Sequence, residues 1–159
     1  MTSMTITREE LIIFALGVTL TMLAYQFVPQ QLEEFKYKEY PMDRIAQNKI
    51  HVYQDNVVID IKDLEWSSYA DTGSMRPTLG AGHNGLEMVI TNKTRLKIGD
   101  IVSYQSNIVK DALIVHRIVD IKYDKDGELF ILKGDSNNDI DPEEIRRPML
   151  RAVLVAIIY

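Results

Sequence analysis

The segment Leu113-Ile114-Val115-His116-Arg117-Ile118-Val119 has the residue pattern of a β-strand. Its β-branched aliphatic residues favour the pleated, half-buried backbone of a sheet. Because successive side chains of a strand point to opposite faces, His116 shares one face with Ile114 and Ile118. The segment therefore predicts a sheet whose buried face carries one histidine.

Similar short apolar runs continue from Lys49 to the end of the chain, separated by residues typical of turns. The predicted strands are Ile50–Tyr53, Val57–Ile61, Leu86–Thr91, Ile101–Tyr104, Leu113–Ile121, Leu129–Leu132 and Leu150–Ile158. No helical crossover separates these runs, so neighbouring strands are expected to pair in an antiparallel way. The predicted fold class is mainly β, an antiparallel β sandwich or distorted barrel.

The N-terminal part of the chain contains one long apolar run, Leu11 to Val28. The preceding Thr7-Arg8-Glu9-Glu10 fits a helix capping box, and Pro29 gives a natural stop. A helix of this length nearly matches a hydrocarbon core about 30 Å thick. A buried soluble helix is the less consistent alternative, because almost every face of the run is apolar. A cleavable signal peptide is disfavoured, because no Ala-x-Ala-like site follows.

The predicted organisation is a transmembrane anchor over residues 1–29, a juxtamembrane linker over 30–48 and a β-rich domain over 49–159. Lys36, Lys38 and Arg44 follow the apolar run, whereas only Arg8 and the chain amine precede it. Taken by itself, the positive-inside rule would place the body of the protein in the cytoplasm.

Composition excludes several classes of function. The formal net charge of −5 argues against a nucleic-acid partner, because a phosphate-binding surface needs a basic excess. The 159 residues include no cysteine, which rules out disulfides, thiolate metal sites and a cysteine nucleophile. No cofactor is implied by any motif in the chain.

The segment Asp71-Thr72-Gly73-Ser74-Met75-Arg76-Pro77-Thr78-Leu79 places a serine directly after a glycine, near a proline with a fixed φ. Such a turn can expose a hydroxyl together with backbone N–H groups, which a nucleophile and an oxyanion site require. A plain surface turn is the alternative, because Asp, Gly, Ser and Pro are common turn residues.

A serine hydroxyl needs a neighbouring base, and His116 is the candidate. Its aliphatic neighbours disfavour the imidazolium, and a general base must be neutral. A core histidine bonded to a backbone group is the alternative. His51 and His83 lack a suggestive neighbourhood.

A third segment, Lys133 to Pro142, gathers acids and amides in a loop after a strand. A carboxylate from this loop could orient His116 through Nδ1. The alternation of Asp135, Asn137 and Asp139 also resembles a calcium loop, but the glycine and glutamate that an EF-hand needs are missing. No metal site is predicted.

In this order, the three segments resemble the type I signal peptidases (S26-type serine proteases), specifically the archaeal and endoplasmic-reticulum branch. Gly73-Ser74-Met75-Arg76-Pro77-Thr78 is similar to the family's Ser-Gly-Ser-Met-x-Pro-Thr box, and Lys133-Gly134-Asp135-Ser136-Asn137 to its Lys-Gly-Asp-Asn-Asn box. His116-Arg117 falls where this branch carries a histidine and the bacterial branch a lysine. The resemblance covers Ala70 to Tyr159 and includes Gly99-Asp100-Ile101-Val102.

The resemblance implies a Ser–His endopeptidase that cleaves signal peptides from exported preproteins. It implies that Ser74 is the nucleophile, His116 the general base and Asp141 the acid that orients the histidine, with Asp139 as the rival. Asp135 would support the loop, and the Thr72 hydroxyl would be a second oxyanion donor beside the Ser74 N–H. Thr72 and Ser136 depart from the family's serine and asparagine.

The family's layout implies a single-pass protein of the cell membrane with its catalytic domain on the extracytoplasmic side, opposite to the charge count. The expected partners are preprotein signal peptides and the lipid bilayer, with association with the secretion translocon as a further candidate.

Two alternatives belong to other classes. Asp71-Thr72-Gly73-Ser74 is also the active-site string of aspartic proteases, which would require a homodimer like the retroviral enzymes. A membrane-tethered β-domain without catalytic activity is the second. A variant of the serine protease would use Lys110 or Lys133 as its base.

Overall fold

The computed structural model describes residue 9 and residues 39–110 and 112–159. The chain divides into two compact units, Met1–Lys38 and Glu39–Tyr159. The apolar run predicted to be a membrane anchor lies outside the described residues. Within the described ranges, no helix is both long enough and apolar enough to cross a bilayer.

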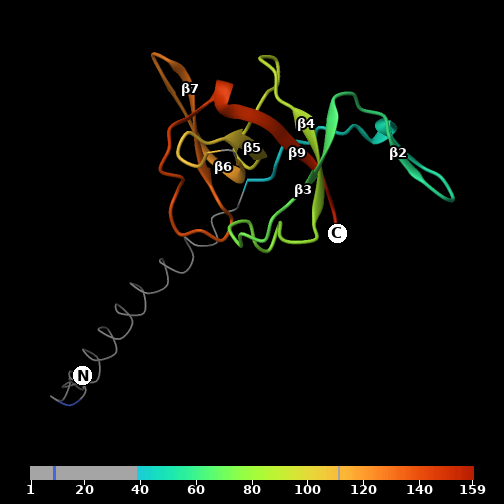
Figure 1. Ribbon diagram of the computed structural model, residues 1–159, viewed down its shortest axis with the longest axis horizontal. Helices are drawn as coiled ribbons and strands as arrows, with labels where there is room; N and C mark the ends of the chain where they lie inside the picture. Colours follow the sequence, from blue (N-terminus) through green and yellow to red (C-terminus); the bar gives the residue numbers. More distant parts are fainter. Residues whose placement is uncertain (1–8, 10–38, 111) are drawn as a thin grey trace, which may run out of the picture. The chain divides into compact units, whose positions relative to one another are not determined.

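The unit Glu39–Tyr159 is built around one seven-stranded antiparallel sheet with the order β3-β4-β9-β5-β6-β7-β8. Its strands are β3 (Leu64–Ser68), β4 (Asn84–Val89), β5 (Ile101–Gln105), β6 (Leu113–Asp124), β7 (Gly127–Lys133), β8 (Ile145–Arg146) and β9 (Leu150–Ile158). Among the described residues, two short 3-10 helices, η1 (Gln47–Lys49) and η2 (Arg147–Met149), precede Ile50 and β9. The C-terminal strand β9 thus lies in the interior of the sheet, between β4 and β5 (Figure 1).

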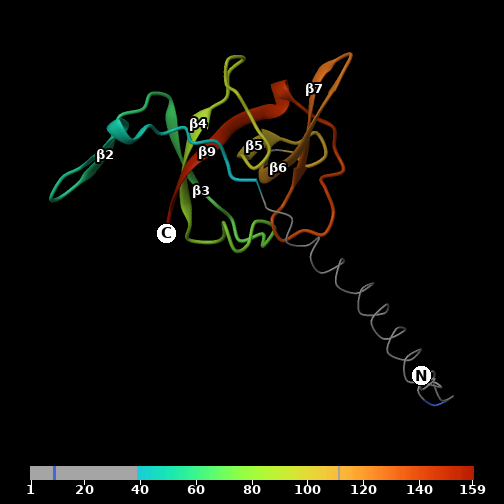
Figure 2. The ribbon, with the colours of Figure 1, turned by 180° about the vertical axis from the view of Figure 1, so that it is seen from behind.

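A separate hairpin pairs β1 (Ile50–Val52) with β2 (Val57–Ile59). It extends away from the large sheet in both ribbon views (Figures 1 and 2). Several of its apolar side chains are exposed, among them Val52 and Val57.

The predicted mainly β, antiparallel architecture is confirmed. The large sheet is one continuous ladder of strands, whereas a sandwich would require a second sheet facing it. All seven predicted runs contain observed strands, but the prediction omitted β3 and β8. Leu64-Glu65-Trp66-Ser67-Ser68 forms an edge strand with several exposed side chains, so it lacks the apolar pattern of the interior strands. The two residues of β8 are too few to show any periodicity.

Both faces of the sheet are covered by apolar side chains, as alternation along β5 demonstrates. Val102 and Tyr104 belong to the larger core cluster, whereas Ile101 belongs to a second cluster. Because successive strand residues point to opposite faces, the two clusters lie on opposite sides of β5. Met75 and Leu79, which belong to the connection after β3, complete the second cluster. That connection carries Ser74 and is therefore anchored by buried side chains on both sides of Arg76.

A buried acid joins the segment before η1 to the sheet. The Asp100 side chain is fully buried and forms an ion pair with Arg44, with 2.5 Å between Oδ2 and Nη2. The backbone N–H groups of Met42 and Lys97 also donate to its carboxylate. Gly99 has φ +99°, and a Cβ there would lie 2.2 Å from the Glu39 carbonyl oxygen. Residues 39–48, part of the expected linker, are thus held against the start of β5.

Replacing Arg44 with alanine is expected to lower the free energy of unfolding by about 3 kcal/mol, because it leaves a buried carboxylate without its counter-charge. Urea unfolding of the full-length protein in detergent, followed by tryptophan fluorescence, measures this loss. Arg76→Ala is the matched control. It breaks the exposed Asp71–Arg76 pair and should change stability much less. Equal losses in the two variants would contradict the assigned role of Asp100.

Candidate active site

The loop that carries Ser74 connects β3 to β4 and is shaped by one glycine and two buried anchors. Gly73 has φ +78°, a conformation that residues with a side chain rarely adopt. Immediately after Ser74, the Met75 side chain is buried against the second core cluster, and so is Leu79. These anchors leave Ser74 half-buried at the surface of the sheet.

The Ser74 hydroxyl lies 3.2 Å from the hydroxyl of Thr72 and within hydrogen-bond distance of it. Asp71 points elsewhere: its carboxylate is exposed and pairs with Arg76 at 2.6 Å. The Ser74 N–H makes no hydrogen bond within the described part of the chain. Around Ser74 the loop thus offers one backbone donor and one neighbouring hydroxyl.

The loop after β7 makes direct contact with Ser74. The Ser136 N–H donates to the Ser74 carbonyl oxygen at 2.8 Å. Gly134 lies so close that a Cβ there would be 2.7 Å from the same oxygen. A side chain at position 134 would therefore push the two loops apart. Figures 1 and 2 both show the green segment after β3 meeting the orange segment after β7.

Asp135 ties these two loops to β6. Its carboxylate accepts two hydrogen bonds from Arg117, each 2.7 Å long, in the bidentate geometry that suits a guanidinium. It also accepts a hydrogen bond from the Thr78 hydroxyl at 2.5 Å. Since the Asp135 side chain is only 2% exposed, this ion pair is well protected from water. Asp135 therefore links the Ser74 loop to the residue that follows His116.

Asp135→Asn is expected to loosen the Ser74 loop, because it removes the charge that Arg117 neutralises. Amide hydrogen exchange over residues 72–79 should become at least about tenfold faster. Hydrogen–deuterium exchange with mass spectrometry measures this change peptide by peptide. Asp139→Asn, an exposed acid in the same loop, is the control and should leave exchange unchanged. Unchanged exchange in both variants would show that the link does not hold the loop.

His116 and Asp141 form a buried hydrogen-bonded pair. His116 Nδ1 lies 2.8 Å from each carboxylate oxygen of Asp141. His116 is 8% exposed, and its strand position opposite Val102 places it on the face of the larger core cluster. The predicted proximity of His116 to the acidic loop is therefore observed, and its contact is Asp141. Asp139 is exposed and makes no hydrogen bond among the described residues.

Tyr104 contacts the His116–Asp141 pair, and it was not predicted from the sequence as a site residue. Its hydroxyl donates to Asp141 Oδ2 at 2.9 Å. Burial, and then the hydrogen bond to Asp141, raises the pKa of Tyr104, so the phenol stays protonated and acts as a donor. A buried tyrosine in an apolar strand carries no sequence signal that distinguishes it from ordinary core.

Ser74 and His116 meet the same end of β7. The β6–β7 ladder ends at the pair Arg117 and Lys133. His116 is the residue before Arg117 on β6, and Gly134 is the residue after Lys133 on the other strand, so both lie at this end of the ladder. Gly134 in turn touches the Ser74 carbonyl. No hydrogen bond joins the Ser74 hydroxyl to His116, or to Lys110 or Lys133, in the described ranges.

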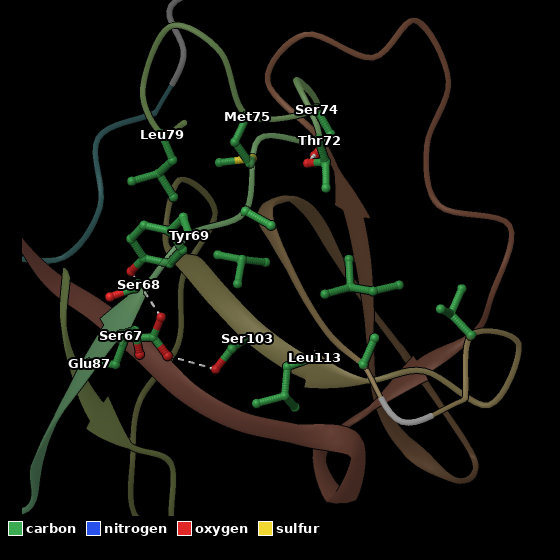
Figure 3. Close-up of a pocket in the computed structure, with 15 residues that line it drawn as sticks. Ser67, Ser68, Tyr69, Thr72, Ser74, Met75, Leu79, Glu87, Ser103 and Leu113 are labelled. Atoms are coloured by element: carbon green, nitrogen blue, oxygen red, sulfur yellow. Dashed lines mark hydrogen bonds between the residues drawn. The ribbon is translucent and has the colours of Figure 1, made fainter. Parts of the chain in front are cut away.

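A pocket of about 470 Å³ opens beside the loop. Figure 3 shows Thr72 and Ser74 at one end of it and Glu87 with Ser103 at the other. Its walls are mostly apolar, and the residues lining it include Met75, Leu79, Leu113, Ile114 and Val115. The Ser74 hydroxyl thus borders a cavity that could hold the side chains of an extended peptide.

The described residues contain no group of three or more histidine or acidic side chains that could hold a metal ion. Asp135, a member of the calcium-like alternation, is engaged by Arg117 and Thr78.

Comparison with known proteins gives two distant relatives. The chain is 33% identical over 81 residues to signal peptidase I W of Bacillus subtilis (strain 168), covering 51% of this chain and 42% of that protein. It is 32% identical over 77 residues to the signal peptidase complex catalytic subunit SEC11 of Plasmodium falciparum (isolate 3D7), covering 48% and 40%. No family model and no solved structure matches. The matched region spans less than half the length of these curated relatives. The resemblance to the signal peptidases is therefore confirmed as a distant sequence similarity over about half of the chain.

Proposed function

We propose that the protein is a membrane-anchored serine endopeptidase that removes signal peptides from exported preproteins, with Ser74 as nucleophile and His116 as general base. The observation that carries this proposal is the buried hydrogen bond between His116 and Asp141 beside the loop that contacts Ser74. The similarity to two signal peptidases supports the choice of substrate.

In the proposed reaction, His116 Nε2 takes the proton of the Ser74 hydroxyl while Oγ attacks the scissile carbonyl carbon. Asp141 remains ionised, holds the proton on Nδ1 and stabilises the imidazolium. The Tyr104 hydroxyl keeps the Asp141 carboxylate in place. In this reaction the Ser74 hydroxyl would exchange its contact with Thr72 for a hydrogen bond to Nε2. Such a change is compatible with a substrate-free structure, since catalytic hydrogen bonds commonly tighten only when substrate binds.

The negative oxygen of the tetrahedral intermediate would be stabilised by the Ser74 N–H and the Thr72 hydroxyl. Nε2 then returns the proton to the leaving amine, the peptide bond breaks, and the signal peptide remains as an ester on Ser74. A water molecule, deprotonated by the same nitrogen, attacks this ester and releases the product. In this scheme Asp135 supports the loop through Arg117 and takes no part in proton transfer.

The proposal includes the membrane. The apolar run 11–28 would anchor the protein in a single pass, and the linker and β-rich domain would follow on the extracytoplasmic side. Preprotein signal peptides and the lipid bilayer are the proposed partners. One relative is named as the catalytic subunit of a complex, which makes partner subunits at the translocon a candidate for this chain too.

The test is cleavage of a preprotein by the full-length protein in detergent, with the new N-terminus identified by sequencing. One cut after a small residue, insensitive to pepstatin and retained by Asp71→Asn, is expected. Asp71 is exposed and paired with Arg76, a poor setting for two carboxylates that must share a proton. Pepstatin inhibition together with loss of activity in Asp71→Asn would favour the aspartic protease instead. Absence of cleavage would favour a non-catalytic domain.

A further inference from the structure

Glu87 is a buried acid that the proposed reaction does not use. It lies on β4, is 4% exposed and lines the pocket beside Ser74. Its Oε1 accepts a hydrogen bond from the Tyr69 hydroxyl at 3.0 Å, and its Oε2 accepts one from the Ser103 hydroxyl at 2.9 Å. Both hydroxyls belong to residues that also line the pocket (Figure 3).

The hydroxyl donors hold the carboxylate but do not neutralise it. Burial, and then the nearby charge of Glu87, raises the pKa of Tyr69, so this phenol is a neutral donor. Within the described residues, no lysine, arginine or histidine forms an ion pair with Glu87. A buried carboxylate without a counter-charge is costly, and each of its oxygens can accept a further hydrogen bond.

Glu87 lines the same pocket as Ser74, so a bound peptide could reach its carboxylate. The Ser74 loop borders the same cavity, and apolar side chains such as Leu79, Leu113 and Val115 form its walls. A peptide side chain that enters such a pocket would pass apolar walls and end near a carboxylate. Its apolar stem would be buried, and a terminal donor would meet an acceptor already fixed by two hydroxyls.

We infer that Glu87 is a specificity-determining residue, and that the pocket accepts a substrate side chain ending in a hydrogen-bond donor in preference to an apolar one of equal size. This inference rests on the proposed peptidase function. An ammonium gains most, because it also supplies the missing counter-charge, and a hydroxyl gains less. The pocket would thus make the protein select substrate side chains by polarity as well as by size.

The test compares peptides that carry a signal-peptide cleavage sequence and differ at one position before the scissile bond. Two matched pairs, lysine with norleucine and threonine with valine, vary the donor and keep the size. The full-length protein should cleave the best-placed lysine peptide with a kcat/KM at least about tenfold above its norleucine partner, and threonine should exceed valine by less. Glu87→Gln should reduce the lysine preference to about threefold or less.

Glu65→Gln is the matched control. Glu65 lies opposite Glu87 in the β3–β4 register, but it is exposed and does not line the pocket. It should keep the full lysine preference. An equal preference in wild type and Glu87→Gln, or no preference in wild type at any position, would overturn the inference.

A binding measurement separates this inference from the proposed function. The Ser74→Ala variant should bind the fluorescently labelled lysine peptide more tightly than the norleucine peptide, and the double variant with Glu87→Gln should not. This binding measurement needs no cleavage. If the protein cleaves no peptide but still binds the lysine peptide more tightly in a Glu87-dependent way, the proposed peptidase function is refuted and the role of Glu87 is supported.

If Glu87→Gln does not fold, Ser103→Ala replaces it in these experiments. Loss of the Ser103 hydroxyl leaves Oε2 open to the ligand and should strengthen the lysine preference, and an unchanged or lower preference would overturn the inference.

Discussion

Ser74→Ala is expected to lower the rate of preprotein cleavage by at least about 10³-fold. The methyl group cannot attack the scissile carbonyl, and no other hydroxyl in the described ranges shares the contacts of Ser74. Thr72 is its nearest partner, but the backbone that approaches Gly134 and Ser136 belongs to Ser74. Cleavage of a purified preprotein by the full-length protein in detergent, followed by gel or mass spectrometry, measures the loss.

Two controls make this result specific. Thr94→Ala removes a hydroxyl from the β4–β5 connection, outside the pocket lining, and should cleave at the wild-type rate. Thermal unfolding of Ser74→Ala should match wild type, because the only hydrogen-bond partner of this hydroxyl in the described ranges is the hydroxyl of the exposed Thr72. Full activity in a well-folded Ser74→Ala protein would refute the proposed nucleophile.

The second large effect is expected at the buried pair. His116→Ala should lower the cleavage rate by on the order of 10³-fold or more, since no base remains to accept the Ser74 proton. Asp141→Asn should cause a comparable loss, because an amide neither stabilises the imidazolium nor fixes the proton on Nδ1. The double variant Ser74→Ala/His116→Ala should be no slower than either single variant, because the residues act as one unit.

Asp139→Asn is the control for Asp141, being an acid of the same loop that is exposed and does not contact His116. It should retain nearly all activity. Strong inactivation by Asp139→Asn with a mild effect of Asp141→Asn would reverse their assignment. Activity retained or improved by His116→Lys while His116→Ala is inactive would point to a base that a lysine can replace.

The periodicity of the chain predicted much of this architecture. The alternation around His116 correctly placed it with Ile114 and Ile118 on one face, because the period of a strand is a local property. The same locality explains what was missed. β3 is an edge strand with several exposed side chains, so it lacks the apolar pattern that marks the interior strands. β8 has only two residues, too few for any alternation to be seen.

Two features of the sequence made members of the candidate site predictable. Ser74 and Asp141 sit in short distinctive strings, and His116 is a single histidine within an apolar strand. Tyr104 and Glu87 lie inside strands and carry no such signal. Their contacts with Asp141, Tyr69 and Ser103 depend on strand order and register, which bring distant segments together. The ion pair of Arg117 with Asp135 is of the same kind, since neither residue alone indicates its partner.

Trapping of the acyl-enzyme tests the central claim most directly. Full-length protein is mixed with excess preprotein, quenched with acid within one turnover, digested and analysed by mass spectrometry. The proposed mechanism predicts that the peptide containing Ser74 carries the C-terminal residues of the signal peptide as an ester, and that Ser74→Ala carries none. Rapid preprotein cleavage with no ester at Ser74, or with the ester on another residue, would contradict the account.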